Sequence, residues 1–287
     1  MTDNMQTADE WRKQLLEQQE KLKNRMSRVK HKIAVISGKG GVGKSTITVN
    51  LAVAFAMHEH VNHIGILDAD IHGPSVPKIL GLSGQRLQAR STEVFPVLGL
   101  LGIKVVSMDF LLLDENAPVI WRGPLKMTAI RQFLSDIVWG DLDILFIDLP
   151  PGTGDEPLSI AQLLPDIDGV IIVTIPSEVS QIVVKKAITF ARRLGMPIIG
   201  IIENMSGFVC PNCGAKVDIF QSGGGKKIAE ELSIQSLGSI PIDQKISEAS
   251  DKGTPFTVKY PDSPASKAFM KIVKKVEEYL KNRDAKT

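Results

Sequence analysis

A glycine-rich segment with two lysines carries the strongest chemical signal in the sequence. Residues 38–46 read Gly-Lys-Gly-Gly-Val-Gly-Lys-Ser-Thr and satisfy the pattern G-x-x-x-x-G-K-[ST]. Glycines let backbone N–H groups approach phosphate oxygens, because no Cβ stands in the way. Lys44 is expected to reach the outer phosphates and Ser45 to place its hydroxyl on Mg²⁺. The candidate phosphate-binding residues are Gly38, Lys39, Gly40, Gly41, Val42, Gly43, Lys44, Ser45 and Thr46.

Carboxylates that could serve phosphoryl transfer stand at the ends of two apolar runs. Asp148 ends the run 144–148, and Asp68 and Asp70 end the run that begins at residue 64. Phosphoryl transfer needs a metal anchor and a group that places water. Asp148 resembles a Walker B aspartate, which holds Mg²⁺ through water. An aspartate at a strand end can instead cap a helix or form a turn, and that alternative stays open for Asp148 and Asp70.

The two cysteines of the chain, Cys210 and Cys213, form a C-x-x-C pair. Two thiolates at this spacing can bind one metal ion or part of a cluster, but zinc and iron–sulfur sites usually take four ligands. A symmetric dimer would bring four thiolates together across its two-fold axis. A bridging iron–sulfur cluster, a bridging structural zinc and a redox or inert pair all stay open. A thioredoxin-like dithiol is disfavoured because this pair follows a late strand.

Apolar strands that alternate with amphipathic helices must position these residues. Such strands, separated by helices, predict a mostly parallel sheet with helices on both faces. We therefore expect an α/β fold in the form of a three-layer sandwich, and the resemblance of residues 38–46 to a phosphate loop implies the P-loop NTPase (SIMIBI-like) type. One domain over 31–287 is expected to hold it, with the cysteine loop at 206–222. The strands are predicted at 32–37, 64–68, 102–107, 142–148, 169–175, 197–202 and 237–240, and the helices at 45–58, 125–138, 179–194, 225–232 and 263–282.

The first 30 residues differ from the rest of the chain. They are rich in charged residues and glutamine and contain no Gly or Pro. We expect a charged, partly helical extension that packs on the body, binds a partner or stays solvated. Apolar residues at helical spacing here are Trp11, Leu15, Leu22, Met26 and Val29.

Composition excludes several classes of protein. With 34 basic and 32 acidic residues, the net charge of +2 argues against binding nucleic acid by overall charge. Two cysteines cannot build a disulfide scaffold. The apolar runs are strand-length and no secretory signal is recognised. We expect a cytoplasmic protein with no nucleic-acid or membrane partner.

Residues 39–45 match K-G-G-x-G-K-[ST] and so resemble the deviant Walker A ATPases. This class includes nitrogenase iron protein, Min- and Par-type positioning ATPases, arsenite-pump ATPases and Mrp-type carriers. The resemblance implies that Lys39 contacts nucleotide phosphates on the facing subunit of a homodimer. It also implies that Asp70 orients or activates the attacking water and that Asp68 supports the metal site.

Asn204 follows a further apolar strand, in Ile202-Glu-Asn-Met-Ser206. In the deviant Walker A class an asparagine at this place contacts the adenine base. Pro241 and Asp243 resemble the other side of the base pocket. Simple turn chemistry after a strand is the alternative for these residues. The resemblance thus assigns catalysis to Lys39, Lys44, Asp70 and Asp148, and Mg²⁺ binding to Ser45, Asp68 and Asp148.

Further segments narrow the resemblance to the Mrp family of iron–sulfur cluster carrier ATPases. They are residues 68–75, 121–124, 148–155, 203–206 and 210–213, and the similarity runs from about residue 31 to 256. The resemblance implies a homodimer that binds and hydrolyses ATP with Mg²⁺. Such a dimer would hold a labile 4Fe–4S cluster on Cys210 and Cys213 of both chains and pass it to apo-proteins.

Other functions stay open beside the carrier. One is a positioning ATPase acting on membrane or DNA, for which the apolar stripe of the last helix, from Phe269 to Leu280, could serve as a membrane-surface anchor. That stripe is more often a core-facing surface. A bridging-zinc ATPase is another alternative. An electron-transfer ATPase like nitrogenase iron protein is disfavoured, because the cluster cysteines of that protein lie far apart in sequence.

Overall fold

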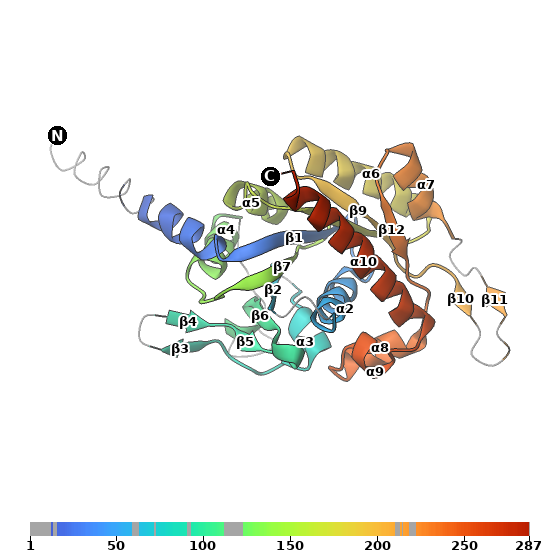
Figure 1. Cartoon of the computed structure of the whole chain (residues 1–287), viewed down its shortest axis with the longest axis horizontal. Coiled ribbons are helices and arrows are strands. Elements are labelled where there is room, and N and C mark those ends of the chain that lie inside the picture. The colour runs from blue at the N-terminus through green and yellow to red at the C-terminus, as the bar shows by residue number, and fades with distance from the viewer. Residues whose placement is uncertain are drawn as a thin grey trace.

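A central eight-stranded sheet organises the chain (Figure 1). The computed structural model describes residues 13, 16–58, 63–71, 73–90, 93–111, 123–209, 213, 215–217 and 222–286. From edge to edge the strands are β12 (Ser236–Ser239), β9 (Ile198–Glu203), β8 (Gly169–Thr174), β1 (Val29–Ser37), β7 (Leu142–Asp148), β2 (Ile64–Asp68), β6 (Lys104–Ser107) and β5 (Val97–Leu98).

Every strand pairing in this sheet is parallel except that of the edge strand β5 with β6. Parallel strands end at the same edge of a sheet, so residues that follow them gather there. β7 lies between β1 and β2, and its register pairs Asp148 with Val35 on one side and with Asp68 on the other. The sheet therefore brings both carboxylate-bearing strands beside the strand that leads into the phosphate loop.

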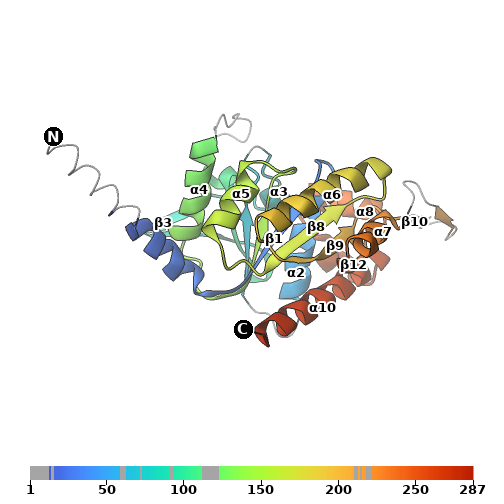
Figure 2. The same cartoon turned by 90° about the horizontal axis from the view of Figure 1, so that it is seen from above.

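Helices cover both faces of the sheet (Figure 2). Because the strands are buried on both sides, neighbouring residues of β1 enter different clusters: Ile33 and Val35 join one, Ala34 and Ile36 the other. The predicted α/β sandwich is confirmed. One face carries α2 (Lys44–Ala56), α3 (Val76–Leu80), α8 (Gln244–Asp251), α9 (Phe256–Lys259) and α10 (Pro264–Asp284), and the other α4 (Gly123–Ser135), α5 (Asp155–Leu163), α6 (Glu178–Arg193) and α7 (Gly224–Glu231).

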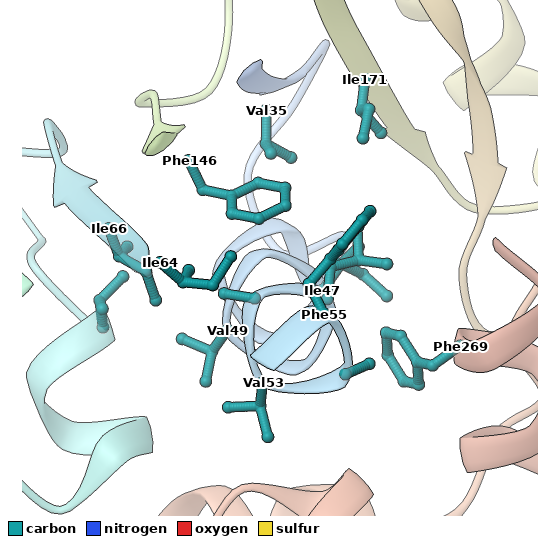
Figure 3. Close-up of a cluster of buried hydrophobic side chains, with 14 of the residues drawn as sticks. Val35, Ile47, Val49, Val53, Phe55, Ile64, Ile66, Phe146, Ile171 and Phe269 are labelled. Atoms are coloured by element: carbon teal, nitrogen blue, oxygen red, sulfur yellow. The ribbon is translucent and has the colours of Figure 1, made fainter. Parts of the chain in front are cut away.

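The core holds α2, which begins at the phosphate loop, tightly against the sheet. Figure 3 shows Phe55 of α2 among strand side chains, with Phe269 of α10 close by. The rings of Phe55 and Phe146 lie 5.6 Å apart in a tilted arrangement. Fully buried aromatic residues each contribute about 1.5–3 kcal/mol by burial alone. The helix that must present its N-terminus to a ligand is thus fixed by packing along its length.

The apolar stripe of α10 belongs to this core. Phe269, Ile272, Val273, Val276 and Leu280 are all buried. α10 packs against α2 and β12, and Lys275 donates a hydrogen bond to the Ser236 carbonyl oxygen of β12, while Lys267, Lys271, Lys274 and Lys281 are exposed. This stripe is therefore a core surface, as expected for most amphipathic helices, and it is not exposed as a membrane anchor. No helix among the described residues is long and apolar enough to span a membrane.

The second half of the N-terminal extension is part of the folded core, although its charged composition does not suggest this. Residues 16–26 are helical, and Leu22 and Met26 are buried in the core on the α4 side of the sheet. The spacing of apolar residues predicts Val29 to be part of the helix, but Val29 is the first residue of β1. β1 thus begins before residue 30, the expected end of the N-terminal extension, because Val29 pairs with Leu142 of β7 and so extends the sheet. Trp11 and Leu15 lie outside the described residues.

Several short elements were not predicted. Helix α5 follows Pro150, Pro151 and Gly152, and a second break, Pro157, lies within its first turn, where proline is tolerated. The strand expected from residue 102 begins at Lys104, because Leu101 and Gly102 adopt left-handed backbone angles. The remaining ones are α3, α8, α9, β5, β3 (Gln88–Arg90), β4 (Glu93–Phe95), β10 (Phe208–Val209), β11 (Lys216–Val217) and the 3₁₀ turns Leu100–Gly102 and Met108–Leu111.

Candidate functional site

The loop between β1 and α2 surrounds a cavity of about 290 Å³. Gly40, Gly41, Val42 and Gly43 line it together with the first residues of α2. Gly43 caps α2 in the left-handed region, with φ of 79°, and so turns the chain into the helix. Unpaired N–H groups and the positive end of the helix dipole therefore face the cavity, which suits an anion.

Glycine is required at two places in this loop by close contact. A Cβ on Gly43 would lie 2.3 Å from Nδ2 of Asn204, and one on Gly38 would lie 2.8 Å from the backbone of Val183 in α6. The loop is thus held between two other segments of the chain. Its shape is set by tertiary packing as well as by its own sequence.

Asp148 gathers the polar side chains at the start of α2. Its Oδ2 accepts a hydrogen bond of 2.5 Å from Ser45 Oγ and lies 2.7 Å from Lys44 Nζ. Its Oδ1 accepts a hydrogen bond of 2.6 Å from Thr48 Oγ1. Asp148 is fully buried, so these charge-assisted contacts offset the cost of burying its carboxylate.

Asp68 places a second buried carboxylate beside the first. It accepts hydrogen bonds from Ser107 Oγ and from the Val76 N–H. Burial raises the pKa of Asp68 well above its usual range, and the charge of Asp148 raises it further, while Lys44 works in the opposite direction. Among the described residues, the carboxylates of Asp68 and Asp148 have only Lys44 as a nearby positive charge in this cluster, so a bound cation would balance the remaining negative charge.

The donor set fits Mg²⁺. Ser45, Asp68 and Asp148 all offer hard oxygen atoms, which Mg²⁺ prefers, and the buried pair of carboxylates favours a divalent cation. Mg²⁺ in such sites usually keeps several waters and binds through one or two carboxylates together with substrate phosphates. The residues present therefore suit a nucleotide-bound Mg²⁺ better than a fully protein-enclosed ion.

Asp70 lines the same cavity from the loop after β2. Its Oδ1 accepts a hydrogen bond from the Gly73 N–H at 3.2 Å, so the carboxylate also stabilises its own turn. Ser75, Ile79 and Pro151 line the cavity as well, and the sequence did not single them out. His72 lies outside the described residues.

Lys39 stands apart from these groups. It is half-buried, and among the described residues it is not part of the cavity lining. Its carbonyl oxygen accepts a hydrogen bond from Ser37 Oγ. The N–H of Gly152, in the run after Asp148, donates to the Ser37 carbonyl oxygen at 2.8 Å. The two loops that flank the cavity are thus tied together through Ser37.

Asn204 joins the end of β9 to the phosphate loop. Its Nδ2 donates a hydrogen bond of 2.8 Å to the Val42 carbonyl oxygen. Pro241 and Asp243 come close in space to this segment, because Ser206 donates its N–H to the Ile240 carbonyl oxygen. The Asp243 side chain caps α8 by accepting from the Lys245 N–H. The expected base-side residues are therefore neighbours, and Asp243 also has the capping role that was the alternative.

Described residues on either side of the cysteine pair form a small hairpin outside the main sheet. The short strands β10 and β11 pair antiparallel, and the pair falls between them in sequence. In Figures 1 and 2 this hairpin projects from the body beyond α7. Cys213 is exposed and not disulfide-bonded, whereas Cys210 lies outside the described residues. Within the described part of the chain, no three or more His, Cys, Asp or Glu side chains gather into a group that could hold a metal ion.

Thr48 is the clearest functional candidate that the sequence missed. The phosphate-loop motif ends before Thr48 and so does not identify it. Thr48 lies one helical turn after Lys44, and this position directs its side chain toward Asp148. Its Oγ1 contacts both the Lys44 carbonyl oxygen and Asp148. Helical spacing together with the β1–β7 pairing is the signal that would have found it.

Comparison with known proteins decides the family. A model of the NUBPL iron-transfer P-loop NTPase family matches residues 28–277, which include the phosphate loop, both aspartate strands and the cysteine pair. This chain belongs to that family. The resemblance indicated by the motifs is thereby confirmed, and the chain is a P-loop NTPase.

Relatives in this family are similar over nearly the whole chain. An iron–sulfur cluster carrier protein of Methanocaldococcus jannaschii is 54% identical over 277 residues, which cover 96% of this chain and 94% of that protein. A protein of the same name from Saccharolobus solfataricus is 56% identical over 256 residues, with 89% and 86% covered.

Solved structures agree with the fold. A nucleotide-binding protein from Archaeoglobus fulgidus, in complex with ADP, has a TM-score of 0.73 at 43% identity and covers 82% of this chain and 91% of its own. The MinD cell division protein of Aquifex aeolicus has a TM-score of 0.61 at 20% identity, with 86% and 97% covered. The second likeness shows the fold alone.

Proposed function

We propose that this NUBPL-family NTPase is an ATP-dependent carrier of iron–sulfur clusters that works as a homodimer. The observation that carries the proposal is the pairing of two features in one chain. A densely bonded phosphate site lies at the carboxyl edge of the sheet, and an exposed hairpin with a C-x-x-C pair leaves the same edge after β9. The relatives named above as cluster carriers support this assignment.

The nucleotide half of the proposal assigns a role to each group at the cavity. Lys44 and the N-terminus of α2 neutralise phosphate charge. Ser45, Asp68 and Asp148 would hold Mg²⁺, which supplies Lewis-acid stabilisation of phosphate oxygens when bound. Asp70 lines the cavity and orients the attacking water. Asn204 and the segment with Pro241 and Asp243 bind the adenine base.

A second copy of the chain completes both sites. Lys39 lies outside the cavity lining of its own chain, which suits a lysine that reaches phosphates of a facing subunit. Val179 and Ile182 of α6 are 67% and 63% exposed, and α6 contacts the phosphate loop through Val183 and Gly38. An exposed apolar surface beside the nucleotide site favours a partner surface there.

The cargo follows from the ligand count. One chain offers two thiolates, and a two-fold dimer offers four, the number that a 4Fe–4S cluster takes. The exposure of Cys213 lets a bound cluster pass to an apo-protein without unfolding of the carrier. Exposed thiolates stay reduced in a cytoplasmic setting, so the proposal places the protein there.

Anaerobic reconstitution with iron and sulfide tests the proposal. The wild-type chain should bind about four iron and four sulfide per two chains, show a 4Fe–4S Mössbauer signature, and activate an apo-protein that needs such a cluster. The variant Cys210→Ser with Cys213→Ser should lose both properties, while Val217→Ala, an exposed change in β11, should keep them. Equal iron binding by the cysteine variant, or binding of zinc alone by the wild type, would contradict the proposal.

A further inference from the structure

Glu203 is a buried carboxylate to which the proposed reaction gives no role. It is the last residue of β9, it is 2% exposed, and it directly precedes Asn204. Its Oε1 accepts hydrogen bonds from Ser206 Oγ at 2.5 Å and from the Gly223 N–H at 3.0 Å. Its Oε2 accepts one from the Gly225 N–H at 2.5 Å. These donors supply the stabilisation that a buried carboxylate needs.

The donors stand on the two sides of the cysteine hairpin. Ser206 lies just before β10, and Gly223 and Gly225 lie at the start of α7, after the hairpin. One carboxylate therefore closes the base of the loop. It occupies the N-terminus of α7, where free N–H groups and the helix dipole favour an anion.

The fit between Glu203 and the start of α7 is close. A Cβ on Gly225 would lie 3.1 Å from Glu203 Cβ and 3.2 Å from its Oε2. Gly223 holds a left-handed φ of 83°, which glycine adopts without strain. The approach of this side chain thus accounts for glycine at position 225, whereas the left-handed backbone accounts for it at position 223.

The neighbouring residue reaches the nucleotide site. Asn204 donates from Nδ2 to the Val42 carbonyl oxygen and packs against Gly43. Met205, between Asn204 and Ser206, has a left-handed φ of 54°, which is unfavourable for a residue with a side chain. A strained residue thus separates a contact to the phosphate loop from the root of the hairpin.

A second connection runs parallel to the first. The Glu203 carbonyl oxygen accepts the Ile240 N–H, Ser206 donates its N–H to the Ile240 carbonyl oxygen, and the Ile242 N–H donates to the Gly207 carbonyl oxygen. The root of the hairpin is therefore bonded to the segment around Pro241 as well. Both segments proposed to touch the adenine base hold the base of the cysteine loop.

We propose that Glu203 is a positioning residue that couples the nucleotide site to the cysteine hairpin. Nucleotide that engages Asn204 and the segment around Pro241 shifts the backbone at residues 204–206. Glu203 passes this shift to the hairpin because it holds both of its ends. The consequence for cluster release rests on the proposed function, whereas the coupling itself does not.

A single-thiol reporter tests the coupling without any cluster. Cys210→Ser leaves Cys213 as the one thiol of the chain. The alkylation rate of Cys213 is measured with and without a non-hydrolysable ATP analogue and Mg²⁺. In this background the nucleotide should change the rate about fivefold or more, the lower range of typical coupling between sites. Chain association is measured by light scattering in the same samples.

Glu203→Gln should bring this ratio close to one, because the amide keeps a single acceptor oxygen and its N–H₂ group cannot accept the hydrogen bond from whichever of Gly223 and Gly225 it faces. Nucleotide affinity and chain association should stay within about threefold of the reporter chain. Glu231→Gln, an exposed change at the end of α7, is the matched control and should keep the full ratio. Ser206→Ala removes one of the three donors and should reduce the ratio partway, which provides a test even where Glu203→Gln is unstable.

Two results would overturn the coupling: a full nucleotide response in Glu203→Gln, or no response in the Cys210→Ser chain itself. The assay contains no iron, so its result is independent of the carrier function. A wild-type chain that fails to load iron but shows the Glu203-dependent response would contradict the proposed function and support the coupling.

Discussion

The phosphate loop and the cysteine hairpin serve the same edge of one sheet, but they differ in how much of a site one chain supplies. The phosphate loop packs against α6 and Asn204, and the polar groups that follow it in α2 already contact Asp148. The hairpin has two-residue strands, and its described cysteine is exposed. One chain supplies most groups of the proposed nucleotide site, to which the proposed dimer adds Lys39, but it supplies only half of the ligand set for a cluster. Binding of nucleotide is thus a property of the chain, whereas binding of a cluster would be a property of the assembly.

Removal of the phosphate-loop lysine should give the largest effect and should spare the hairpin. Lys44→Ala is expected to lower the rate of ATP hydrolysis about a thousandfold, because it removes a preorganised charge from the transferring phosphate. Iron and sulfide binding should remain. Phosphate release and metal content are measured on the same preparation, and unchanged hydrolysis would show that this loop is not the catalytic site.

Removal of one cysteine should impair iron binding and leave the phosphate loop unaffected. Cys213→Ser reduces the number of thiolates at a two-fold site from four to two. Iron affinity should therefore fall about a hundredfold or more, because even the loss of a residue that only supports a metal ligand lowers metal affinity about 10–100-fold. ATP hydrolysis should stay within about threefold of the wild type. Iron titration followed by absorbance checks this, and Val217→Ala is the control. Retention of a full cluster would place its ligands elsewhere.

A smaller effect is expected at the contact between the phosphate loop and Asn204. Gly43→Ala forces a Cβ to within 2.3 Å of Asn204 Nδ2 at a φ of 79°, which costs about 1–3 kcal/mol. ADP affinity should fall about tenfold or more by calorimetry. Gly73→Ala is the matched control, because a Cβ there meets no atom within 4 Å. Equal affinities of the two variants would argue that the Gly43 contact does not shape the site.

The smallest effect on activity should come from a carboxylate outside both regions. Burial acts to raise the pKa of Asp168, but the nearby His31, the hydrogen bond from the Lys32 N–H and the charge of Arg283 lower it overall. A lowered pKa contributes stability above the unfolded value of 3.8, and this contribution is lost as the pH falls through the folded pKa.

Asp168→Asn should therefore destabilise the fold by about 1–2 kcal/mol at pH 7, while ATP hydrolysis by the folded chain stays unchanged. The difference from the wild type should shrink below about pH 4. Thermal melts from pH 3 to 7 measure it. A difference that is independent of pH would show that the ionised carboxylate contributes nothing.

The sequence predicted those parts of the molecule whose determinants are local. The strands at 64–68 and 142–148 have the predicted bounds, because each is an apolar run that ends at an aspartate. Helix α5 was missed because the proline and glycine residues before it indicate a break, although Pro157 fits a first helical turn. Local pattern thus located the central strands but not the elements that follow breaks.

Contacts between distant segments could not be predicted. Thr48 meets Asp148 across 100 residues, and Asn204 reaches Val42 across 162. Glu203 was part of a motif, yet its role at the base of the hairpin depends on Gly223 and Gly225, which approach it only in the folded chain. The roles of Lys39, Asp70 and Pro241 remain predictions that a structure of the nucleotide complex can decide.

The contacts of Asp148 with Ser45, Thr48 and Lys44 affect the net free energy with which nucleotide binds. Because these groups bind one another, an arriving ligand gains only the difference between its own contacts and those it displaces. When the product departs, the same contacts form again within the chain. The contacts that Asp148 makes within the chain thus lower the net affinity for nucleotide, relative to a site whose groups have no partners of their own.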